Sequence, residues 1–274
     1  MMHLTQEEQD MLNGARGETV RKCMKVLVTL GEIYGADHMI EVKNVHTPGV
    51  SYRVAGDAGL GYVRDASQDA KFCVPTTLNT IGIDEQDWKK IGFPEEFSHK
   101  QLELSKAYRD LGAISTCSCT PYLNGNIPMF GEHIAWGESS AVAFVNSVIG
   151  ARTNREGGPT ALAAAITGRV PAYGYHLDEN RRGTHLIQVD VELKTDKDFA
   201  ALGYFGGKIA GKDVPVFTGI KKRPTLEQFK ALGAALASAG AVALYHVVGF
   251  TPEAPTKEAV ISDDIQPIIF DQAA

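Results

Sequence analysis

Apolar and polar side chains alternate along this chain with two different periods, and the period changes from one segment to the next. From residue 17 to residue 31, apolar side chains such as Val20, Met24 and Leu27 recur at helical spacing, which predicts an amphipathic helix. Residues 186–193 alternate apolar and polar side chains one by one, which predicts a half-buried strand. The same two patterns predict helices over residues 5–14, 98–111, 160–167 and 224–240, and strands over residues 39–45, 71–75 and 241–250. Helices and strands in alternation indicate an α/β fold.

Local signals mark where several of these helices begin and end. Thr5 precedes Glu8, and Thr225 precedes Gln228, at the spacing of a capping box, in which each side chain pairs with the other residue's backbone amide. Gly168 follows the segment 160–167 and suits the left-handed conformation that ends many helices. We therefore expect helices that begin beside residues 5 and 225, and one that ends at residue 168.

The stretch from residue 117 to residue 169 concentrates side chains that can do chemistry. Its glycines, in the motifs NGN, FGEH and REGG, indicate tight loops, and the apolar run 141–149 between them indicates a buried element. The polar residues at the expected ends of elements are Glu132, His133, Glu138, Ser139, Asn154 and Arg155. Acid-base chemistry or carboxylate binding suits this set, and a structural hydrogen-bonding role suits each member taken singly.

Two of the predicted strands also end in polar loops. The strand over residues 39–45 leads into HTPGVSY, and the strand over residues 71–75 leads into PTTLN. Ligands of open α/β sheets bind beside the carboxyl ends of the strands, so the polar residues of these loops are candidates for substrate contact. These residues are Ser51, Thr76, Thr77 and Asn79. Hydroxyl and amide groups also stabilise turns, so both roles remain open from the residues alone.

The composition of the 274 residues narrows the class of protein. With 44% hydrophobic and 22% charged residues, the chain has the profile of a soluble globular protein, and no apolar run approaches the ~20 residues of a membrane span. The net charge of −6 and the single basic run, residues 221–223, argue against nucleic acid binding, and that run is interpreted as a solvated turn. The polar N-terminal segment has no signal-peptide pattern, so we expect a cytoplasmic protein.

The four cysteines are too few for a disulfide scaffold in a chain of this length. Cys23 falls on the apolar stripe of a predicted helix and Cys73 within a predicted strand, so both are expected to be buried. Cys117 and Cys119 form a C-x-C pair, where thiolates can hold iron or zinc, although two cysteines complete neither kind of site. A metal role and a role as ordinary thiols are both open.

Three common catalytic or cofactor motifs are missing from the sequence. The segment GDAGLG, residues 56–61, lacks the spacing of a dinucleotide-binding loop, and no GxxxxGK[ST] phosphate-binding motif occurs. The segment GESSA, residues 137–141, is not the G-x-S-x-G turn of serine hydrolases. These observations exclude the usual sequence signatures of Rossmann cofactor sites, nucleotide triphosphatases and α/β-hydrolases.

Many short motifs, in one order along the chain, resemble those of aconitase X, a branch of the aconitase superfamily. They include CTPY, GEHIAW, ESSAVAF, GARTNREGGP and HLDENR in the central part, and GVSY, GDAGL, VPTTLN and ALYHVVGFTPEAPT on either side of it. The resemblance covers residues 1 to about 258. It implies a layered α/β/α architecture, with residues 1–274 as the N-terminal portion of the family's catalytic domain. The candidate positions for an internal boundary are residues 110–120 and 170–185, and the composition does not choose between them.

The resemblance implies a hydro-lyase, a dehydratase that removes water from a small hydroxy acid with an iron or iron–sulfur centre. The two substrates that it suggests are cis-3-hydroxy-L-proline and mevalonate 5-phosphate. The loop Gly49-Val50-Ser51 agrees with the second, whereas Thr80 stands where that branch typically has proline. Cys119, directly before Thr-Pro-Tyr, is the implied iron ligand, and Cys117 is a weaker candidate. The residues and the resemblance together predict these substrate contacts: Gly49, Val50, Ser51, Thr77, Asn79, Glu138, Ser139, Asn154 and Arg155.

The resemblance also implies parts that this sequence does not supply. The other cluster cysteines of the family come from a segment beyond the last residue here, so the expected ligand set is incomplete. The catalytic base of the superfamily is a serine on a small swivelling domain, which implies a separate small subunit as partner. The alternative hypothesis is a non-catalytic ligand-binding or subunit-interaction remnant, because residues 261–274 show no recognisable match to the family.

Overall fold

The computed structural model describes residues 2–272, which form two compact units. The first unit comprises the residues up to Ile127, together with residues 133–138 and 156–173. The second unit comprises residues 128–132 and 139–155 and the residues from Gly174 onward. Each unit combines helices with parallel strands, which confirms the predicted α/β fold. Within residues 2–272, no helix has the length and apolar character that a membrane span requires.

The first unit is built around a small parallel sheet. Its strands are β2 (Val45–Thr47), β3 (Thr76–Leu78) and β4 (Ala135–Trp136), in the order β3-β2-β4. Val45 pairs with both Thr76 and Ala135, so the three strands run parallel and end at one edge. Strands β1 (Met39–Glu41) and β5 (Arg169–Pro171) form a separate antiparallel pair.

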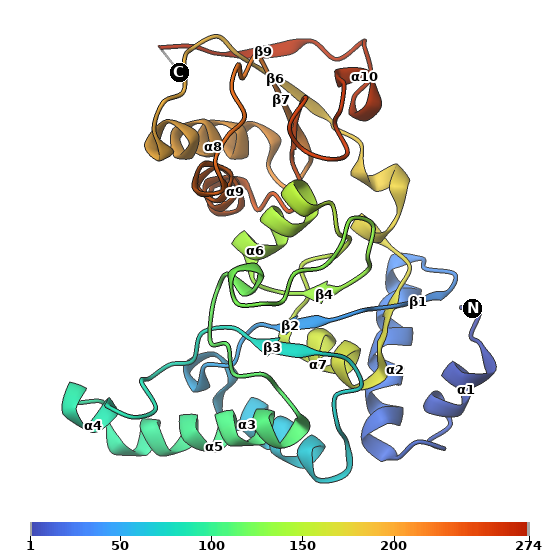
Figure 1. Cartoon of the computed structure of the whole chain (residues 1–274). Coiled ribbons are helices and arrows are strands. Elements are labelled where there is room, and N and C mark those ends of the chain that lie inside the picture. Colours follow the sequence, from blue (N-terminus) through green and yellow to red (C-terminus); the bar gives the residue numbers. More distant parts are fainter. Residues whose placement is uncertain (1, 273–274) are drawn as a thin grey trace. The chain divides into compact units, whose positions relative to one another are not determined.

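Helices cover one side of the strands β2 and β3 (Figure 1). They are α2 (Glu18–Tyr34), α3 (Tyr52–Asp69), α5 (Glu95–Leu111) and α7 (Gly158–Thr167), with the short α1 (Gln6–Leu12) and α4 (Trp88–Ile91) and the 3-10 turn η1 (Pro121–Leu123) at the periphery. Met24 and Leu27 of α2 are fully buried in the core, as the spacing of apolar residues predicts. Cys23 is buried beside them, which confirms that expectation as well.

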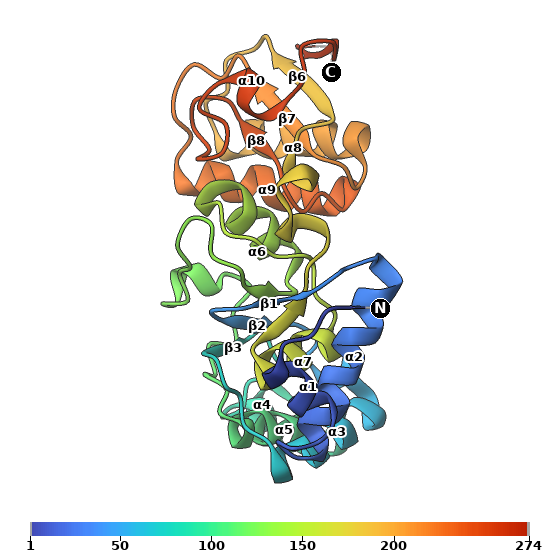
Figure 2. The same cartoon turned by 90° about the vertical axis from the view of Figure 1, so that its right-hand side faces the viewer.

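The second unit contains a four-stranded parallel sheet in the order β8-β7-β6-β9. The strands are β6 (His185–Val189), β7 (Pro215–Thr218), β8 (His246–Val247) and β9 (Pro267–Phe270). Helices α8 (Asp196–Ala210) and α9 (Leu226–Gly240) pack side by side on one face of this sheet (Figure 2). Their backbones approach closely because a glycine stands at the contact: a Cβ on Gly240 would lie 2.0 Å from the carbonyl oxygen of Gly207. The unit also includes α6 (Ser139–Phe144), the π-helical turn η2 (Val145–Ile149), the 3-10 turns η3 (Gly174–His176) and η4 (Asp178–Arg181), and α10 (Lys257–Val260).

The predicted helix ends are confirmed by side-chain contacts. Thr5 and Glu8 form both hydrogen bonds of a capping box, and Thr225 and Gln228 do the same at the start of α9. Gly168 adopts φ +68° directly after α7. These boundaries depend on hydrogen bonds within a few residues, which is why the sequence alone can locate them.

All four strand predictions need correction. The strand predicted over residues 186–193 is β6, which ends at Val189. The segment 39–45 is two strands, because the chain leaves the pair β1-β5 and joins a different sheet at Val45. The segment 71–75 is not a strand and bends at residues 73–74, the strand begins only at Thr76, and Cys73 is exposed rather than buried. In the segment 241–250 only β8 joins the sheet, because Tyr245 donates its backbone N–H to the Ser147 hydroxyl instead of to a strand.

Candidate functional site

Three loops leave the carboxyl edge of the parallel sheet in the first unit, and each carries a predicted site residue. Strand β2 leads to Gly49, β3 leads to Asn79, and β4 leads to Glu138. Because β2, β3 and β4 are parallel and in register, the loops that follow them begin side by side. The positions that the sequence indicates on separate segments are therefore brought to one edge.

Two glycines allow these loops to approach one another. Gly49 has φ +71°, a backbone conformation that side-chain-bearing residues rarely adopt. A Cβ on Gly137 would lie 2.2 Å from Pro48 Cγ and 2.5 Å from the carbonyl oxygen of Glu156, so any larger residue would separate the loops. The glycine before Glu138 thus fixes the position of that carboxylate beside the β2 loop.

Asn79 lies at the centre of a hydrogen-bonded group of side chains. Its amide Nδ2 donates to Glu138 Oε2 at 3.2 Å. Its Oδ1 accepts from the Cys119 thiol at 3.2 Å and from the backbone N–H of Thr80 at 2.8 Å. The Thr80 hydroxyl lies 3.9 Å from the sulfur of Cys119. An amide, a carboxylate, a thiol and a hydroxyl are therefore gathered within one set of contacts.

The two cysteines of the C-x-C pair have different surroundings. The segment that carries them runs beside β3, where the backbone N–H of Ser118 donates to the carbonyl oxygen of Leu78 at 3.2 Å. Cys119 faces Asn79 and Thr80, whereas the charges of Glu85 and Arg109 act on the thiol of Cys117. Burial, together with the Glu85 carboxylate, raises the pKa of the Cys117 thiol.

His46, in the middle of β2, is a buried residue that connects β2 to the neighbouring strand β3. It is fully buried, and its Nδ1 lies 2.9 Å from the hydroxyl of Thr77 on the neighbouring strand. The same hydroxyl accepts from Asn126 Nδ2 at 2.9 Å, and the Nε2 of His46 has no hydrogen-bond partner among residues 2–272. Burial lowers the pKa of His46 to about 4, partly offset by the negative charge of Glu138. The ring is therefore neutral at physiological pH.

A second support holds the loop after β2. The buried Gln101 of α5 accepts from the backbone N–H of Tyr52 at 2.7 Å and donates to the carbonyl oxygen of Val50 at 3.0 Å. The side chain of Val50 is itself buried, so only its backbone can face a ligand. Ser51 stands at the start of α3 but makes no capping bond with its side chain. Its hydroxyl is thus not committed to capping the helix.

His46, Asn126 and Gln101 are missing from the predicted site residues. Gln101 is a polar residue on the apolar stripe of a helix, three positions before Leu104, and that position signals a buried polar contact. His46 falls within a strand of only three residues, Val45–Thr47, where no periodicity can be read. Asn126 lies in a glycine-containing loop, and nothing local indicates that its amide reaches Thr77.

The other predicted contacts belong to the second unit. Ser139 begins α6, and the Oδ1 of Asn154 accepts from the backbone N–H of Tyr175 at 2.9 Å. Arg155 donates from Nη2 to the carbonyl oxygens of Ala241 and Val242 at 3.2 and 3.3 Å, beyond the C-terminus of α9. The contacts described for Asn154 and Arg155 hold loops together.

Glu132 and Arg181 also make structural contacts in the second unit. Glu132 accepts at Oε2 from the backbone N–H of Met129 at 2.9 Å. The buried Arg181 pairs with Glu253 at 2.8 Å and also donates to the carbonyl oxygens of Asn146 and Tyr175. This guanidinium has its donors occupied and is unsuited to a substrate carboxylate.

Among the side chains around Asn79, the thiol of Cys119 is the group that suits a ligand of an iron centre. Among residues 2–272, no three His, Cys, Asp or Glu side chains are grouped so as to hold a metal ion. Cys119 offers a single thiol, and iron–sulfur clusters are commonly held by four. The described residues at this edge therefore offer one thiol, and they do not form a complete cluster site.

Comparison with models of known protein families shows to which family the chain belongs. The family model for the aconitase X first domain matches residues 1–179, and the model for the second domain matches residues 183–273. The chain belongs to the aconitase X family. The second match includes residues 261–273, so the expectation that this segment has no counterpart in the family is wrong. Within it, β9 pairs with β6, which makes it part of the sheet.

Individual aconitase X relatives agree with this assignment. The chain is 53% identical to the phosphomevalonate dehydratase large subunit of Methanothermobacter thermautotrophicus over 92% of its own length and 63% of the relative's. It is 38% identical to the cis-3-hydroxy-L-proline dehydratase of Pseudomonas aeruginosa, over 90% of this chain and 43% of the relative. The crystal structure of Thermococcus kodakaraensis aconitase X in its holo-form superposes with a TM-score of 0.89 at 47% identity, covering 99% of this chain and 67% of that one. The chain thus spans about two thirds of the length of several relatives and less than half of others.

Proposed function

We propose that this chain is part of the large, catalytic component of a dehydratase that removes water from a small hydroxy acid. One observation carries the proposal: in a chain of the aconitase X family, Asn79 joins Glu138 and Cys119 at the carboxyl edge of a parallel sheet. Relatives such as those from Methanothermobacter and Pseudomonas are named dehydratases. Because the chain spans 63% of the first of these, we propose the activity for an assembled enzyme.

The chemistry of the three side chains suits a hydroxy acid. The Asn79 amide is both donor and acceptor, so it can exchange its bonds to Glu138 and Cys119 for bonds to a substrate. The Glu138 carboxylate accepts hydrogen bonds only and can orient a substrate hydroxyl. Ser51, whose hydroxyl makes no capping bond, supplies a further polar group on the loop after β2.

Cys119 is proposed as one ligand of an iron or iron–sulfur centre, with the remaining ligands from outside residues 2–272. When bound, such a centre supplies a Lewis acid for the leaving hydroxyl. Asn79 holds the Cys119 sulfur in a defined position before any metal binds, because the two side chains are 3.2 Å apart. Cys117 is a poorer ligand candidate, because it does not face Asn79 and because burial raises the pKa of its thiol above the ordinary value.

Mevalonate 5-phosphate is the substrate that we propose first. Relatives named phosphomevalonate dehydratase large subunit, from Methanothermobacter thermautotrophicus and Methanocaldococcus jannaschii, are 53% and 48% identical to the chain. Those named cis-3-hydroxy-L-proline dehydratase, from Pseudomonas aeruginosa and Hypocrea jecorina, are 38% and 36% identical. Since the first group is named as a large subunit, we also propose a small subunit as partner and as the source of the catalytic base.

A hybrid enzyme tests this proposal. The chain is joined to the part of the Methanothermobacter large subunit that it does not match, assembled with that enzyme's small subunit, and loaded anaerobically with iron and sulfide. We expect turnover of mevalonate 5-phosphate and not of cis-3-hydroxy-L-proline. Asn79→Ala should lower kcat/KM by about 10- to 100-fold, since a substrate group loses a hydrogen bond involving charge. Asn13→Ala, at the exposed end of α1, is the matched control and should leave kcat/KM unchanged.

Two results would contradict parts of the proposal. An iron-loaded, assembled hybrid without activity toward either compound would favour the non-catalytic alternative. Equal activity of the Asn79→Ala and Asn13→Ala variants, with equal thermal stability, would show that Asn79 only stabilises its loop.

A further inference from the structure

A second candidate binding site lies within the second unit and is independent of the proposed dehydratase site. A cavity of about 530 Å³ opens between the loop that follows β6 and the loop that follows β7. The residues that line it are Val191, Glu192, Leu193, Lys194, Phe199, Ile220, Lys221, Lys222, Arg223, Thr225 and Gln228. Because β6 and β7 are parallel neighbours, this cavity lies at the carboxyl ends of two strands, the usual place for ligands of open α/β sheets.

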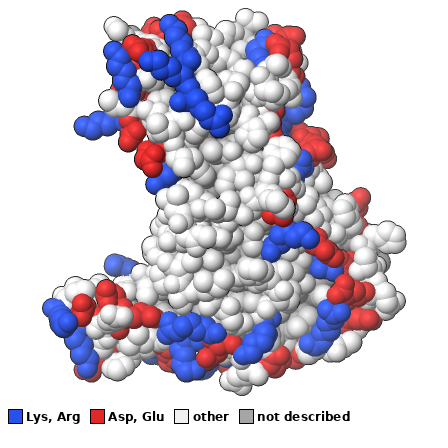
Figure 3. Space-filling view, in the orientation of Figure 1, with Lys and Arg blue, Asp and Glu red and all other residues white. Residues whose placement is uncertain are grey.

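The cavity is lined by an excess of positive charge. Lys194, Lys221, Lys222 and Arg223 face a single carboxylate, that of Glu192. Glu192 lies 3.3 Å from Lys194 Nζ, and no ion pair joins residues 221–223 to any other residue in the range 2–272. On the face that Figure 3 shows, Lys and Arg side chains form a patch over the part of the second unit where Figure 1 places α8 and the sheet. Uncompensated cations around a hollow attract an anion.

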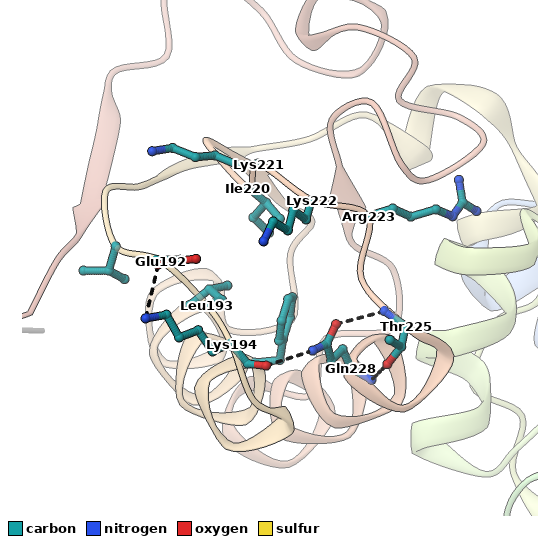
Figure 4. Close-up of a pocket in the computed structure, with 11 residues that line it drawn as sticks. Glu192, Leu193, Lys194, Ile220, Lys221, Lys222, Arg223, Thr225 and Gln228 are labelled. Atoms are coloured by element: carbon teal, nitrogen blue, oxygen red, sulfur yellow. Dashed lines mark hydrogen bonds and ion pairs between the residues drawn. The ribbon is translucent and has the colours of Figure 1, made fainter.

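The three consecutive cations differ in direction. Figure 4 shows the ammonium group of Lys222 extending toward the hollow, whereas Lys221 and Arg223 extend outward on either side. The run 221–223 is exposed, as expected of a solvated turn, but its middle residue is directed at the cavity. This geometry distinguishes Lys222 from its neighbours, which carry the same charge.

The remaining lining is apolar or already hydrogen-bonded. Phe199 is buried, and Val191, Leu193 and Ile220 are partly buried around it. Thr225 and Gln228 satisfy each other in the capping box of α9, and Gln228 also lies 3.5 Å from the carbonyl oxygen of Lys194. A ligand here therefore meets cations on one side and apolar side chains on the other, with few free polar groups between them.

We propose that this cavity binds a small phosphate monoester with a short apolar body, its phosphate held by Lys222 and its body packed on Phe199, Leu193 and Ile220. A phosphate monoester carries nearly two negative charges at neutral pH and has three acceptor oxygens, so it pairs strongly with an ammonium group. A monocarboxylate of the same length brings one charge and binds more weakly.

Calorimetric titration of the whole chain tests the ligand class. The probes are n-butyl phosphate, inorganic phosphate, butyrate and n-butanol, at about 0.15 M ionic strength, where long-range attraction is screened. We expect n-butyl phosphate to bind at least about fivefold more tightly than inorganic phosphate, because the butyl group buries apolar surface. Butyrate should bind more weakly than n-butyl phosphate, and n-butanol should not bind measurably. Equal affinity for both phosphates, or no heat with n-butyl phosphate, would overturn the proposal.

Two neighbouring substitutions separate a site from a diffuse charge effect. Lys222→Gln should weaken n-butyl phosphate binding by about tenfold or more, the usual effect of losing one hydrogen bond to a charged group. Lys221→Gln removes the same charge one residue away and should weaken binding by less than about twofold. Both residues are exposed, so the variants should fold alike, and matching thermal unfolding curves check this. Equal weakening by the two substitutions would show that the cations attract the phosphate only through their summed charge. It would contradict the proposal that Lys222 forms a specific binding site.

Discussion

The buried His46 should make the stability of the first unit depend on pH in a way that one substitution can isolate. In the folded chain, burial lowers the pKa of His46 to about 4, with Glu138 acting in the opposite direction. In the unfolded chain a histidine titrates near pH 6.5. At a pH between these two pKa values, His46 is protonated in the unfolded state and neutral in the folded state. The free energy of unfolding therefore falls as the pH is lowered.

The size of the effect follows from the two pKa values. At pH 7.5 the ring is neutral in both states and contributes no pH dependence. At pH 5.0 the unfolded state is mostly protonated and the folded state is not, which lowers the free energy of unfolding by about 2 kcal/mol at 1.36 kcal/mol per pH unit. The loss reaches about 3 kcal/mol below pH 4 and then stops, because both states are then protonated.

A substitution that keeps the hydrogen bond but does not titrate isolates this contribution. In His46→Asn, a side-chain polar atom takes the approximate position of Nδ1 and can still meet the Thr77 hydroxyl. The variant should be less stable than the wild type at pH 7.5, because part of the ring volume beside Trp136 is lost. The difference in unfolding free energy between the two proteins should shrink by about 2 kcal/mol between pH 7.5 and pH 5.0.

Urea unfolding followed by tryptophan fluorescence measures this difference. The chain has two tryptophans, Trp88 and Trp136, and both belong to the first unit, so their emission reports that unit. Titrations of other groups cancel in the comparison of wild type and variant. His46→Gln serves as a second non-titrating variant, with a different absolute stability and the same change with pH. A difference that stays constant within about 0.5 kcal/mol would show that His46 takes up its proton as readily in the folded chain as in the unfolded one, which would contradict its lowered pKa.

Two further predictions concern single side chains. In the iron-loaded hybrid, Cys119→Ala should lower the iron content measured by elemental analysis, whereas Cys117→Ala should not, because only Cys119 faces Asn79; equal iron in both would remove Cys119 from the site. Arg181→Met should lower the free energy of unfolding of the second unit by about 3–5 kcal/mol, because it leaves the Glu253 carboxylate without its buried partner. Arg182→Met, at the exposed next position, should change it by less than about 0.5 kcal/mol; hydrogen exchange of residues 139–155 measures both, and similar values would show that the ion pair contributes little.

The parts of the fold that the sequence predicts are those that local contacts determine. The apolar stripe of α2 and the capping boxes at Thr5 and Thr225 involve residues within one or two helical turns, so they can be read directly. The sequence also indicates Asn79 and Glu138 as polar residues in loops at the ends of elements, and the two are 59 positions apart. Parallel pairing of β2 with both β3 and β4 brings them together, and no local pattern records that pairing.

Glycine explains why two of the longer helices are missing from the sequence prediction. Helix α3 contains Gly59 and Gly61 and has a kink at Gly56, and α8 contains Gly206 and Gly207; these residues resemble loop residues when only neighbours are considered. In α8 the glycines are required by packing, because a Cβ on Gly207 would lie 3.0 Å from the carbonyl oxygen of Leu236 in α9. The missing side chain therefore reflects a close contact between helices and not a break in the helix.

The candidate site combines a regular backbone with side chains that can exchange partners. The loops are tied one residue beyond the strands: the backbone N–H of Asn79 donates to the carbonyl oxygen of Thr47 at 3.1 Å, and that of Gly137 donates to His46 at 3.2 Å. Asn79 and Glu138 are thus presented from a continued hydrogen-bond ladder, so a ligand need not order these loops in order to bind. A substrate that binds as proposed must break the hydrogen bonds of Asn79 to Glu138 and Cys119, and it forms new hydrogen bonds in their place. Selectivity at this edge should then depend on how well the substrate replaces those bonds, which is why the Asn79 amide is the decisive residue to change.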